Sequence, residues 1–499
     1  MGGMKTLAKE TAIYGVSSIL GKFMSWCLTP MYTFVLASTS ELGEVTNIYA
    51  IIALLQVLLT FGMETGFFRF VNKTEEKEKA VYSTTLITVG SVILISLVLA
   101  FLFLNPIAKL FMQESHPEYI GMMFVVLGLD SFCAIPFAFL RFKKKPIRFA
   151  GIKFIYIILS IVFNIFFLII CPWLTSTEGA YLIEWFYRPN YGVGYVLVAN
   201  LLATFLETLF LLPYFTGFRY TFDINLAKRM LRYSLPLLVL GIAGIMNQTF
   251  DKIMMPYLIP EGKDPMGQLG IYGACVKIAV VLTMFTQAFR YAYEPFIFGK
   301  HKEERGKSNT AYSEAMKYFI ICSLFIFLGV SFYLDIVKYI LERNFWEGLA
   351  IVPIVMFGDI FMGVFFNLSM WYKLNDETHW GIWFSLIGFV FIVAINVLFV
   401  PHYGYTASAW AIFVSYLVMM VASYVIGQKR YPIQYNMKSA GNYTLLTALL
   451  FVIGMYAPID NIVLRLGFRT FLLFLFIAYT IKYDLPLKEI PILNRYLKK

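Results

Sequence analysis

The chain has 499 residues, of which 59% are hydrophobic and only 14% are charged, whereas soluble domains carry about 25% charged residues. Its length alone would suggest about three soluble domains, but so few charges could not cover their surfaces, so the composition excludes a soluble protein and predicts a polytopic membrane protein. The formal net charge of +11 is then explained by Lys and Arg in cytoplasmic loops rather than by nucleic-acid binding.

Fourteen apolar runs are long enough to cross a bilayer as helices, which takes about 20 residues each. In chain order they are residues 11–36, 45–68, 81–104, 118–140, 149–171, 192–215, 233–259, 266–298, 313–334, 347–372, 379–400, 403–427, 441–458 and 461–481. The first run follows Lys5 and Lys9 and is too long for the apolar core of a signal peptide, so we expect it to remain as a span.

The distribution of basic residues predicts the orientation of these spans. With the N-terminus inside, the even-numbered connections and both termini hold 28 Lys and Arg, and the outer connections hold 5. Because cytoplasmic loops are enriched in Lys and Arg, both termini are predicted to be cytoplasmic. Basic clusters such as residues 141–148, RFKKKPIR, act first as topology determinants and second as contacts for lipid headgroups.

No segment outside the membrane is long enough to form a catalytic domain. The longest outer connection, 172–191, has about 20 residues, and no GxxxxGK[ST] phosphate-binding loop occurs. The five cysteines are scattered through apolar runs, and the four histidines lie far apart without an HExxH motif. We therefore expect neither an enzyme nor a metal or cofactor, and a function carried out inside the bilayer.

Several landmarks recur at a nearly constant offset along the chain. Leu42-Gly43 and Leu269-Gly270 open the second and eighth spans, 227 residues apart. The other pairs are Tyr82-Ser83 with Tyr312-Ser313, Asp130 with Asp359, and Asn164 and Pro172 with Asn396 and Pro401. Each of these prolines is followed by a Tyr-Gly, Tyr191-Gly192 and Tyr403-Gly404, at a shorter offset. Their order predicts two homologous six-helix bundles, followed by two extra helices.

This duplication divides the chain into residues 1–217, 218–440 and 441–499. Because six is an even number of spans, both bundles insert with the same orientation, and a transport path is expected between them, along a pseudo-twofold axis parallel to the membrane normal. The amphipathic stretch 218–232, FRYTFDINLAKRMLR, predicts a helix lying on the cytoplasmic face. The predicted architecture is that of a transporter in which one bundle rocks against the other.

Ionisable side chains deep in a span cost a few kcal/mol each and need a partner or a water-filled cavity. The deep ones are Lys22, Glu64, Asp130, Asp251, Lys252, Lys277, Arg290 and Asp359. Neither Lys22 nor Lys277 has an acidic residue within one helical turn, which favours a cavity role for both. Arg290 could instead pair with Glu294, four residues further on.

The remaining ionisable groups have competing explanations. Asp251 and Lys252 point about 100° apart on a helix, so we expect them to neutralise each other poorly. Asp130 and Asp359 could be protonated, buried and structural. Arg69, Lys153 and Lys317 lie near the cytoplasmic boundary, where snorkelling to the headgroups explains them, and Glu207 lies shallow on the same side.

If the basic side chains face the space between the bundles, the cargo is anionic. Fixed cations in a low-dielectric cavity attract polyanions strongly, and the guanidinium fork suits phosphate. The candidate residues for an anionic headgroup are Lys22, Arg69, Lys252, Lys277 and Arg290. The candidate carboxylates for ion coupling, or for pairing with these bases when the site is empty, are Glu64, Asp130, Asp251 and Asp359.

Three stretches carry a family resemblance. They are KETAIYGVSSIL (9–20), NQTFDKIMM (247–255) followed by LGIYGACVKI (269–278), and NVLFVPHYG (396–404) leading into ASA (407–409). Together with the twelve-plus-two order of spans, over about residues 5–430, they resemble the oligosaccharide/polysaccharide flippases of Wzx type. That family lies within the fold group of the multidrug-and-toxin-extrusion exporters and lipid II flippases.

The resemblance implies a bacterial inner-membrane protein that moves an undecaprenyl-pyrophosphate-linked oligosaccharide from the cytoplasmic to the periplasmic leaflet. It further implies two bundles in a V shape around a cationic cavity, with Asp251, Lys277 and Arg290 in the matching motifs. The capsule and O-antigen pathways are the settings it suggests, with other polysaccharide-assembly proteins as possible partners. The outer connection after the fifth span is longer than its counterpart after the eleventh, so the outer gates of the two bundles could differ.

Two other classes compete with this interpretation. A cation-coupled multidrug antiporter shares the fold, and the basic cavity is the feature that argues against it. A membrane-bound polymerase or glycosyltransferase would carry a large outer loop with catalytic residues, and the short connections argue against that class. The sequence leaves the sugar repeat and the coupling ion open.

Overall fold

A computed structural model describes residues 19, 21, 23, 26–73, 78–177, 180–216, 219–303, 308–375 and 377–484. Within these ranges the chain is helical and contains no strand. The α-helices are α2 (Thr39–Thr60), α3 (Met63–Lys73), α4 (Glu78–Leu102), α5 (Leu104–Leu110), α6 (Pro117–Phe142), α7 (Pro146–Ile165), α8 (Cys171–Thr175), α9 (Gly192–Phe215), α10 (Ile224–Leu258), α11 (Pro265–Glu303), α12 (Ser308–Phe332), α13 (Leu334–Val337), α14 (Val352–Leu368), α15 (Met370–Leu374), α16 (His379–Tyr403), α17 (Tyr405–Arg430), α18 (Met437–Tyr456) and α19 (Ile462–Tyr483). The short segments are the π-helix η1 (Phe166–Ile170) and the 3₁₀ helices η2 (Ala180–Leu182), η3 (Glu261–Lys263), η4 (Lys338–Ile340) and η5 (Arg343–Ile351).

The all-helical membrane architecture predicted from the sequence is confirmed. Among the described residues, 13 helical stretches are long and apolar enough to cross a membrane, and each overlaps one of the predicted spans from the second to the fourteenth. The predicted first span, 11–36, lies mostly outside the described residues, and a helix covers 26–35. The count of fourteen and the cytoplasmic termini stay predictions.

Two spans differ from the sequence interpretation in their local geometry. The second is broken: α2 ends at Thr60, Phe61 adopts a left-handed conformation (φ 33°), and α3 begins at Met63. The helix predicted over 218–232 begins later than expected and is continuous with the next span, because α10 runs from Ile224 to Leu258; its position on the cytoplasmic face stays a prediction. Asp223 caps α10 by accepting from the backbone N–H groups of Asn225 and Leu226, so the amphipathic stretch becomes the first turns of a 35-residue helix.

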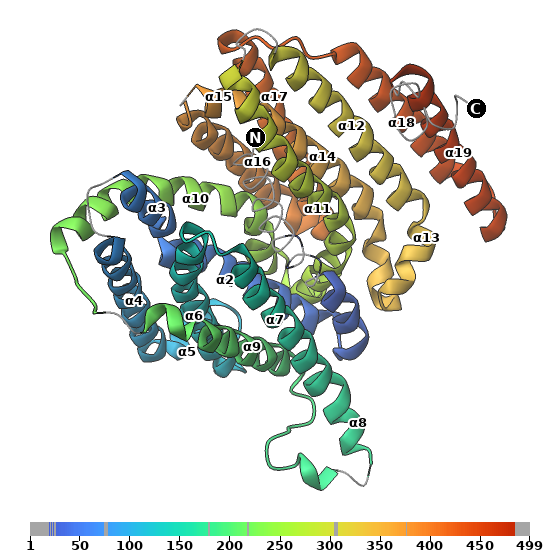
Figure 1. The fold of residues 1–499 in the computed structure, drawn as a ribbon. Coiled ribbons are helices and arrows are strands. Elements are labelled where there is room, and N and C mark those ends of the chain that lie inside the picture. Colours follow the sequence, from blue (N-terminus) through green and yellow to red (C-terminus); the bar gives the residue numbers. More distant parts are fainter. Residues whose placement is uncertain are drawn as a thin grey trace, which may run out of the picture.

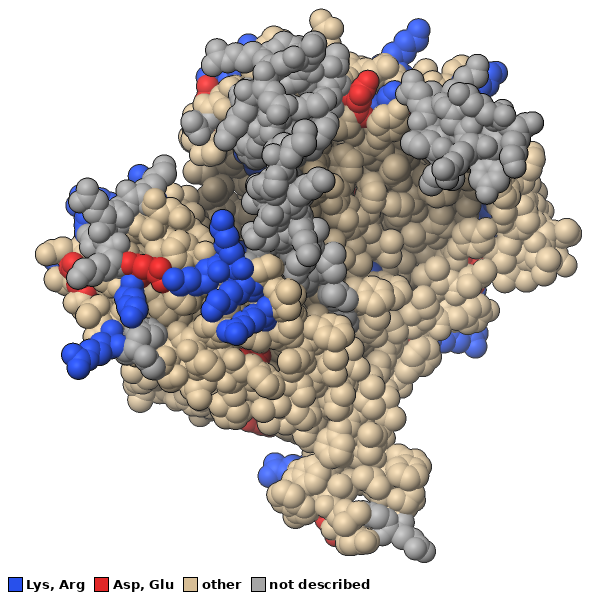
Figure 2. All heavy atoms as spheres, viewed as in Figure 1, with Lys and Arg blue, Asp and Glu red and all other residues tan. Residues whose placement is uncertain are grey.

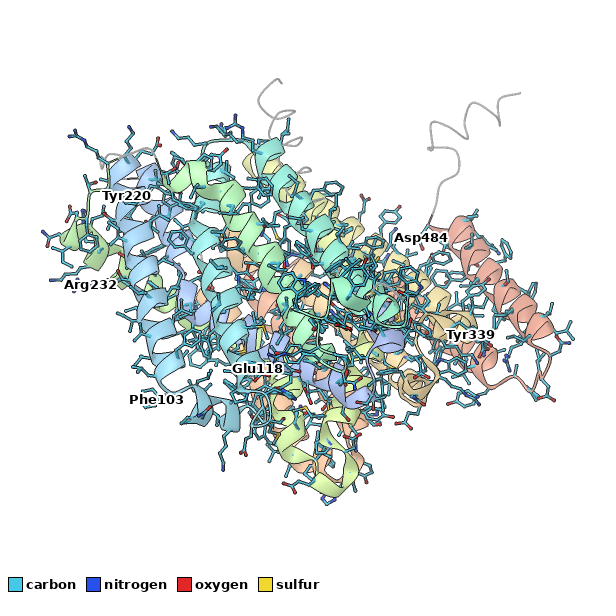
Figure 3. All side chains as sticks on the ribbon, turned by 90° about the horizontal axis from the view of Figure 1, so that it is seen from below. Phe103, Glu118, Tyr220, Arg232, Tyr339 and Asp484 are labelled. Carbon is cyan, nitrogen blue, oxygen red and sulfur yellow. The ribbon has the colours of Figure 1, made fainter. Side chains whose placement is uncertain are left out.

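The helices gather in two groups, one made of α2–α9 and the other of α11–α19, with α10 running between them (Figure 1). Helix α10 contacts α3 and α4 of the first group as well as α16 of the second, and α2 packs along both α10 and α11. The side view separates the ends of the helices. Tyr220 and Asp484 lie towards one edge and Phe103, Glu118 and Tyr339 towards the other (Figure 3), as the alternation of inner and outer connections requires.

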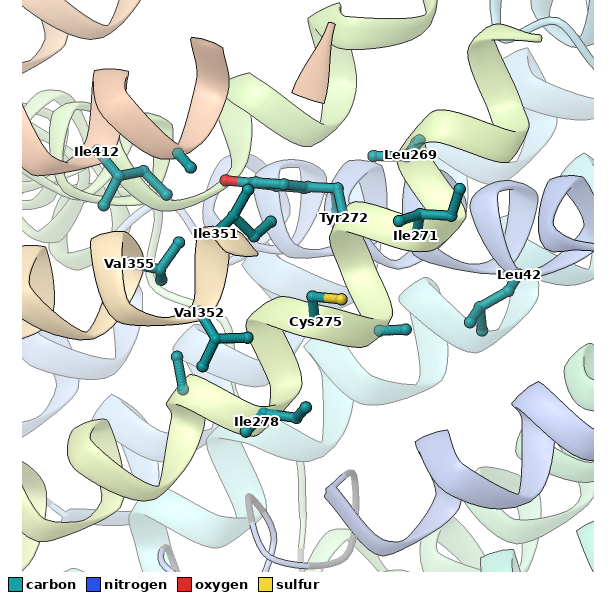
Figure 4. Close-up of a cluster of buried hydrophobic side chains, with 14 of the residues drawn as sticks. Leu42, Leu269, Ile271, Tyr272, Cys275, Ile278, Ile351, Val352, Val355 and Ile412 are labelled. Atoms are coloured by element: carbon teal, nitrogen blue, oxygen red, sulfur yellow. The ribbon is translucent and has the colours of Figure 1, made fainter. Parts of the chain in front are cut away.

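The core of the second group surrounds α11. Its buried side chains include Tyr272, Cys275 and Ile278, which meet Ile351, Val352 and Val355 from η5 and α14, while Leu42 of α2 lies on the other side of α11 (Figure 4). Tyr272 is 0% exposed. Burying an aromatic ring of this size stabilises a soluble core by a few kcal/mol; in lipid, where apolar surface is already dry, tight packing is the larger contribution.

Helices α2 and α11 cross at a pair of glycines that the predicted duplication aligns. A Cβ atom at Gly43 would overlap the carbonyl oxygen of Met266, and one at Gly270 would overlap that of Thr39. Thr39 and Met266 are 227 residues apart, as Gly43 and Gly270 are. The contact is therefore symmetric about an axis between the two helices. Small residues of this kind let helix backbones approach closely in membranes.

A second duplicated landmark has the same role in both halves. The side-chain amide of Asn164 donates to the carbonyl of Ser160 at 2.7 Å, and that of Asn396 donates to the carbonyl of Ile392 at 2.8 Å. The free oxygen of each asparagine accepts from a hydroxyl, of Tyr32 in the first half and of Ser408 in the second. Each buried side-chain amide is thus hydrogen-bonded to the backbone carbonyl four residues earlier in its own helix and to a hydroxyl on a neighbouring helix.

Candidate functional site

The two halves meet along a seam formed by α2, α10 and α11. Besides the glycine crossing, Ser40 of α2 donates to Asp264 before α11 at 3.0 Å, and Asn47 of α2 donates to the backbone carbonyl of Lys252 in α10 at 3.0 Å. The predicted orientation places the glycine crossing at the outer ends of both helices. The seam is therefore closed at that end in this conformation.

Asp251 is the most deeply buried ionisable group of the predicted site, with 2% of its surface exposed. Its Oδ2 accepts from the Tyr272 hydroxyl at 2.5 Å, and its Oδ1 lies 3.3 Å from the ammonium of Lys252. The Tyr272 hydroxyl extends away from α11 towards α17 (Figure 4). Tyr416 of α17 donates to the Asn247 carbonyl at 3.3 Å, which closes the cluster on that side.

The expectation that Asp251 and Lys252 neutralise each other poorly is wrong. Although neighbouring residues leave a helix about 100° apart, the four-carbon stem of lysine lets Lys252 fold back, and its ammonium also donates to the Gln248 carbonyl at 2.8 Å. The side chain of Lys252 keeps 19% exposure. It forms a cation that is held by a carboxylate and still reachable from the seam.

Lys277 is half-buried and lies on the face of α11 that meets α2. Residues 270, 273 and 277 share that face by helical spacing, and Gly270 and Gly273 contact Thr39 and Thr46 of α2. Lys277 lies 12 residues inside the start of α11, about 18 Å along the axis, which is near the middle of a bilayer core. It is therefore placed on the seam at membrane depth.

Asp359 lies near the Asp251 cluster, and Arg290 lies further along α11, against α14. Asp359 of α14 is half-buried and within electrostatic range of Tyr272 and Tyr416, as Asp251 is, so the four residues form one polar cluster. The guanidinium of Arg290 lies 4.3 Å from the ring centre of Phe366 in α14. The alternative partner of Arg290, Glu294, has a side chain outside the described part.

Asp130 belongs to a second polar cluster, inside the first group. It is within electrostatic range of Lys153 of α7 and Glu207 of α9 and within hydrogen-bonding reach of Thr204. The Lys153 ammonium lies 2.9 Å from Glu207, which is 1% exposed, and 4.2 Å from the ring centre of Phe137. Lys153 is thus paired with a buried carboxylate and does not need snorkelling to explain it.

The remaining candidates lie at helix ends that the sequence predicts to be cytoplasmic, or outside the described residues. Glu64 of α3 forms an ion pair with Arg141, the first residue of the predicted cytoplasmic cluster 141–148, so it lies shallower than the sequence suggested. Arg69 is exposed and stacks on Tyr233, with its guanidinium carbon 4.2 Å from the ring centre. Lys22 lies outside the described residues.

The structure therefore brings together only part of the predicted site, and it adds residues that the sequence did not suggest. Tyr272 and Tyr416 were missed because tyrosine is abundant in this chain and most of it is expected at membrane interfaces. Lys153 and Glu207 were assigned to similar depths in adjacent spans, which was a signal for pairing. Within the described ranges no three His, Cys, Asp or Glu side chains converge as metal ligands.

Comparisons with known proteins agree with this architecture. A family model described as "Polysaccharide biosynthesis protein" matches residues 7–299. The fold is similar to that of the lipid II flippase MurJ in an inward closed conformation, with a TM-score of 0.72 and 14% identity over 95% of this chain and 98% of that one.

Multidrug transporters show the same fold with lower scores. An inward-facing MATE family transporter of the MOP superfamily has a TM-score of 0.65 and 14% identity over 83% of this chain and 94% of that one. The Vibrio cholerae MATE transporter VcmN has a TM-score of 0.59 and 12% identity over 86% of this chain and 98% of that one. A search of curated protein sequences finds no match.

Proposed function

Because the chain belongs to the polysaccharide biosynthesis protein family and has the fold of a lipid II flippase, we propose that it is a flippase for polyprenyl-pyrophosphate-linked oligosaccharides. It moves the saccharide headgroup from the cytoplasmic to the periplasmic leaflet of a bacterial inner membrane. The task is to take a hydrated, charged headgroup through hydrocarbon, which is prohibitive without a polar, cationic path.

The observation that carries the proposal is the position of two lysines on the seam between the halves. Lys277 lies on the α2-facing side of α11, and Lys252 lies where Asn47 of α2 contacts α10. A pyrophosphate on this seam meets fixed positive charge at membrane depth, whereas cationic drugs are repelled by it. The polyprenyl tail stays in lipid between the two groups of helices.

The polar cluster around Asp251 couples movement of the saccharide to uptake of a proton or a metal cation. Asp251 holds Lys252 when the site is empty, and an arriving pyrophosphate competes for the ammonium, leaving Asp251 to take up a proton or a metal cation. Tyr272 keeps the carboxylate in place during this exchange. The outer glycine crossing separates when the halves rock, which releases the saccharide on the periplasmic side.

The test uses the purified protein in liposomes that contain a pyrophosphate-linked oligosaccharide lipid. Exposure of the saccharide to an external lectin or glycosidase is measured for the wild type, for Lys277→Gln and for Lys438→Gln, an exposed lysine of α18 that serves as the charge-matched control. We expect Lys277→Gln to slow exposure and Lys438→Gln to leave it unchanged. Efflux of a cationic dye without saccharide exposure would assign the protein to the multidrug antiporters instead.

A further inference from the structure

The first group carries a pocket at the junction of α6, α7 and α9, and this pocket plays no part in the proposed transport. It has a volume of about 580 Å³, within the usual size of a small-molecule site. Its walls come from the ends of helices that the sequence places at the cytoplasmic surface. The basic residues that line the pocket are Lys143, Lys145 and Arg148, and its other lining residues are Phe139, Gly151, Ile152, Ile155, Phe210, Pro213 and Tyr214. Figure 2 shows lysines and arginines gathered over this junction.

The three basic residues are not equivalent. Lys143 is neutralised by Glu78, whose oxygen lies 2.7 Å from the ammonium. Arg148 donates to the Tyr214 hydroxyl at 3.1 Å, and the Lys145 ammonium lies 5.9 Å from the centre of the same ring. Within the part of the chain that is described, neither Lys145 nor Arg148 forms an ion pair, so two cations and a phenol converge without a carboxylate.

Below this polar rim the pocket is apolar and open to the lipid. Ile155 lies seven residues after Arg148 on α7, about 10 Å deeper along the helix, and is 37% exposed. Phe210 lies four residues before Tyr214 on α9, about 6 Å deeper, and is 47% exposed. Charge at the surface and an exposed apolar wall beneath it match the two ends of a phospholipid.

We propose that this pocket binds an anionic phospholipid of the cytoplasmic leaflet, with the phosphate between Lys145, Arg148 and the Tyr214 hydroxyl and an acyl chain along Ile155 and Phe210. Arginine and lysine donate charge-assisted hydrogen bonds to phosphate, and basic pockets between membrane helices select anionic headgroups. The occupant is a resident lipid and not the transported one, because none of the residues that line the pocket belongs to α2, α10 or α11, the helices of the seam.

The test measures thermal unfolding of the full-length protein in neutral detergent with added phosphatidylglycerol, phosphatidylcholine or soluble glycerol phosphate. The variant is Lys145→Gln/Arg148→Gln. The control is Lys144→Gln, which removes a positive charge from the same connection but lies outside the pocket lining. Tyr214→Phe keeps the ring and removes only the hydroxyl, so it tests the site if the double variant fails to fold.

We expect phosphatidylglycerol, and not phosphatidylcholine, to stabilise the wild type and the Lys144→Gln control. The double variant should bind phosphatidylglycerol at least about tenfold more weakly, and Tyr214→Phe should fall between the two. An equal loss in the control would mean diffuse surface charge and overturn the proposal. Equal stabilisation by glycerol phosphate would identify a free-anion site and would also overturn the proposal.

Discussion

Asp251 remains buried in a membrane-spanning helix because its carboxylate has two partners of different kinds. The Tyr272 hydroxyl donates to Oδ2 at 2.5 Å, and the Lys252 ammonium lies 3.3 Å from both oxygens. A buried charge is tolerated when it is both paired and hydrogen-bonded. The two partners also differ in kind, since the buried phenol is fixed and the lysine reaches the seam, so only one of them can be exchanged for a ligand.

Tyr272→Phe tests whether Tyr272 is the partner that fixes the Asp251 carboxylate. The substitution removes a hydrogen bond to a carboxylate, which contributes about 1.5–3 kcal/mol, so we expect a lower melting temperature and slower transport. Tyr416→Phe is the matched control, because its hydroxyl donates to a neutral backbone carbonyl at 3.3 Å and its loss costs only about 0.5–1.5 kcal/mol. Equal effects of the two substitutions on melting and transport would contradict the role of Tyr272.

Lys153 and Glu207 form a pair in which one partner is far more buried than the other. Replacing Lys153 by Met leaves the Glu207 charge uncompensated, and we expect a destabilisation below the about 3–5 kcal/mol of a fully buried pair, because 35% of the lysine is exposed. Lys153→Met/Glu207→Gln should restore part of the lost stability. The measurement is a double-mutant cycle of detergent thermal unfolding, and additive losses would show that the pair is not coupled.

At the scale of helices, the α2–α11 crossing is the contact most sensitive to size. Gly270→Ala places a methyl group against the Thr39 carbonyl, and such overpacking costs about 1–3 kcal/mol. Since the strain exists only while the outer ends are together, the equilibrium should shift towards outward opening by roughly 5- to 150-fold.

Labelling by a membrane-impermeant maleimide measures this shift, with a Thr46→Cys reporter whose side chain lies against Gly273 in the α2–α11 contact and a background without the five native cysteines. Gly244→Ala is the control, because α10 leaves open space around that glycine, so the substitution should stabilise the helix by about 0.5–1 kcal/mol without changing the labelling rate. Unchanged labelling in Gly270→Ala would show that the crossing is not a gate.

The positions of the helices followed from the sequence because an apolar run long enough to span a bilayer has few alternatives. Thirteen of the predicted spans overlap helices of the structure. The differences lie where the bilayer does not decide: the helix predicted over 218–232 begins only at Ile224, where Asp223 caps it, and continues into the next span as α10, which packs against α3 and α4. The break at Phe61 likewise has no signal in hydropathy.

The site was less predictable, because pairing between spans depends on how the helices rotate and pack. Glu64 had been placed with the cavity carboxylates, yet it pairs with Arg141 at the end of α6. Depth along a span can be estimated from the sequence, whereas the direction in which a side chain points cannot. The equal offsets aligned Gly43 with Gly270 along the chain, but only the structure shows that these two glycines meet.

At the scale of the whole molecule, the proposed rocking mechanism requires the predicted outer ends of the two halves to separate. Ser40 and Asp264 join those ends with side-chain oxygens 3.0 Å apart, so cysteines at both positions should form a disulfide. In a background without the five native cysteines, we expect oxidation of Ser40→Cys/Asp264→Cys to stop saccharide exposure and a reductant to restore it. The single variants Ser40→Cys and Asp264→Cys serve as controls, because neither can form the cross-link. Full transport by the cross-linked protein would rule out rocking about this seam.

The symmetric meeting of Gly43 and Gly270 also bears on how the chain evolved. In a homodimer with a twofold axis, a residue on the axis touches its own copy, and such an isologous contact needs only one suitable residue. Duplication and fusion of an ancestral gene would turn that self-contact into two positions 227 residues apart. The outer gate would then be older than the single chain, descending from a dimer interface in which one glycine served both subunits.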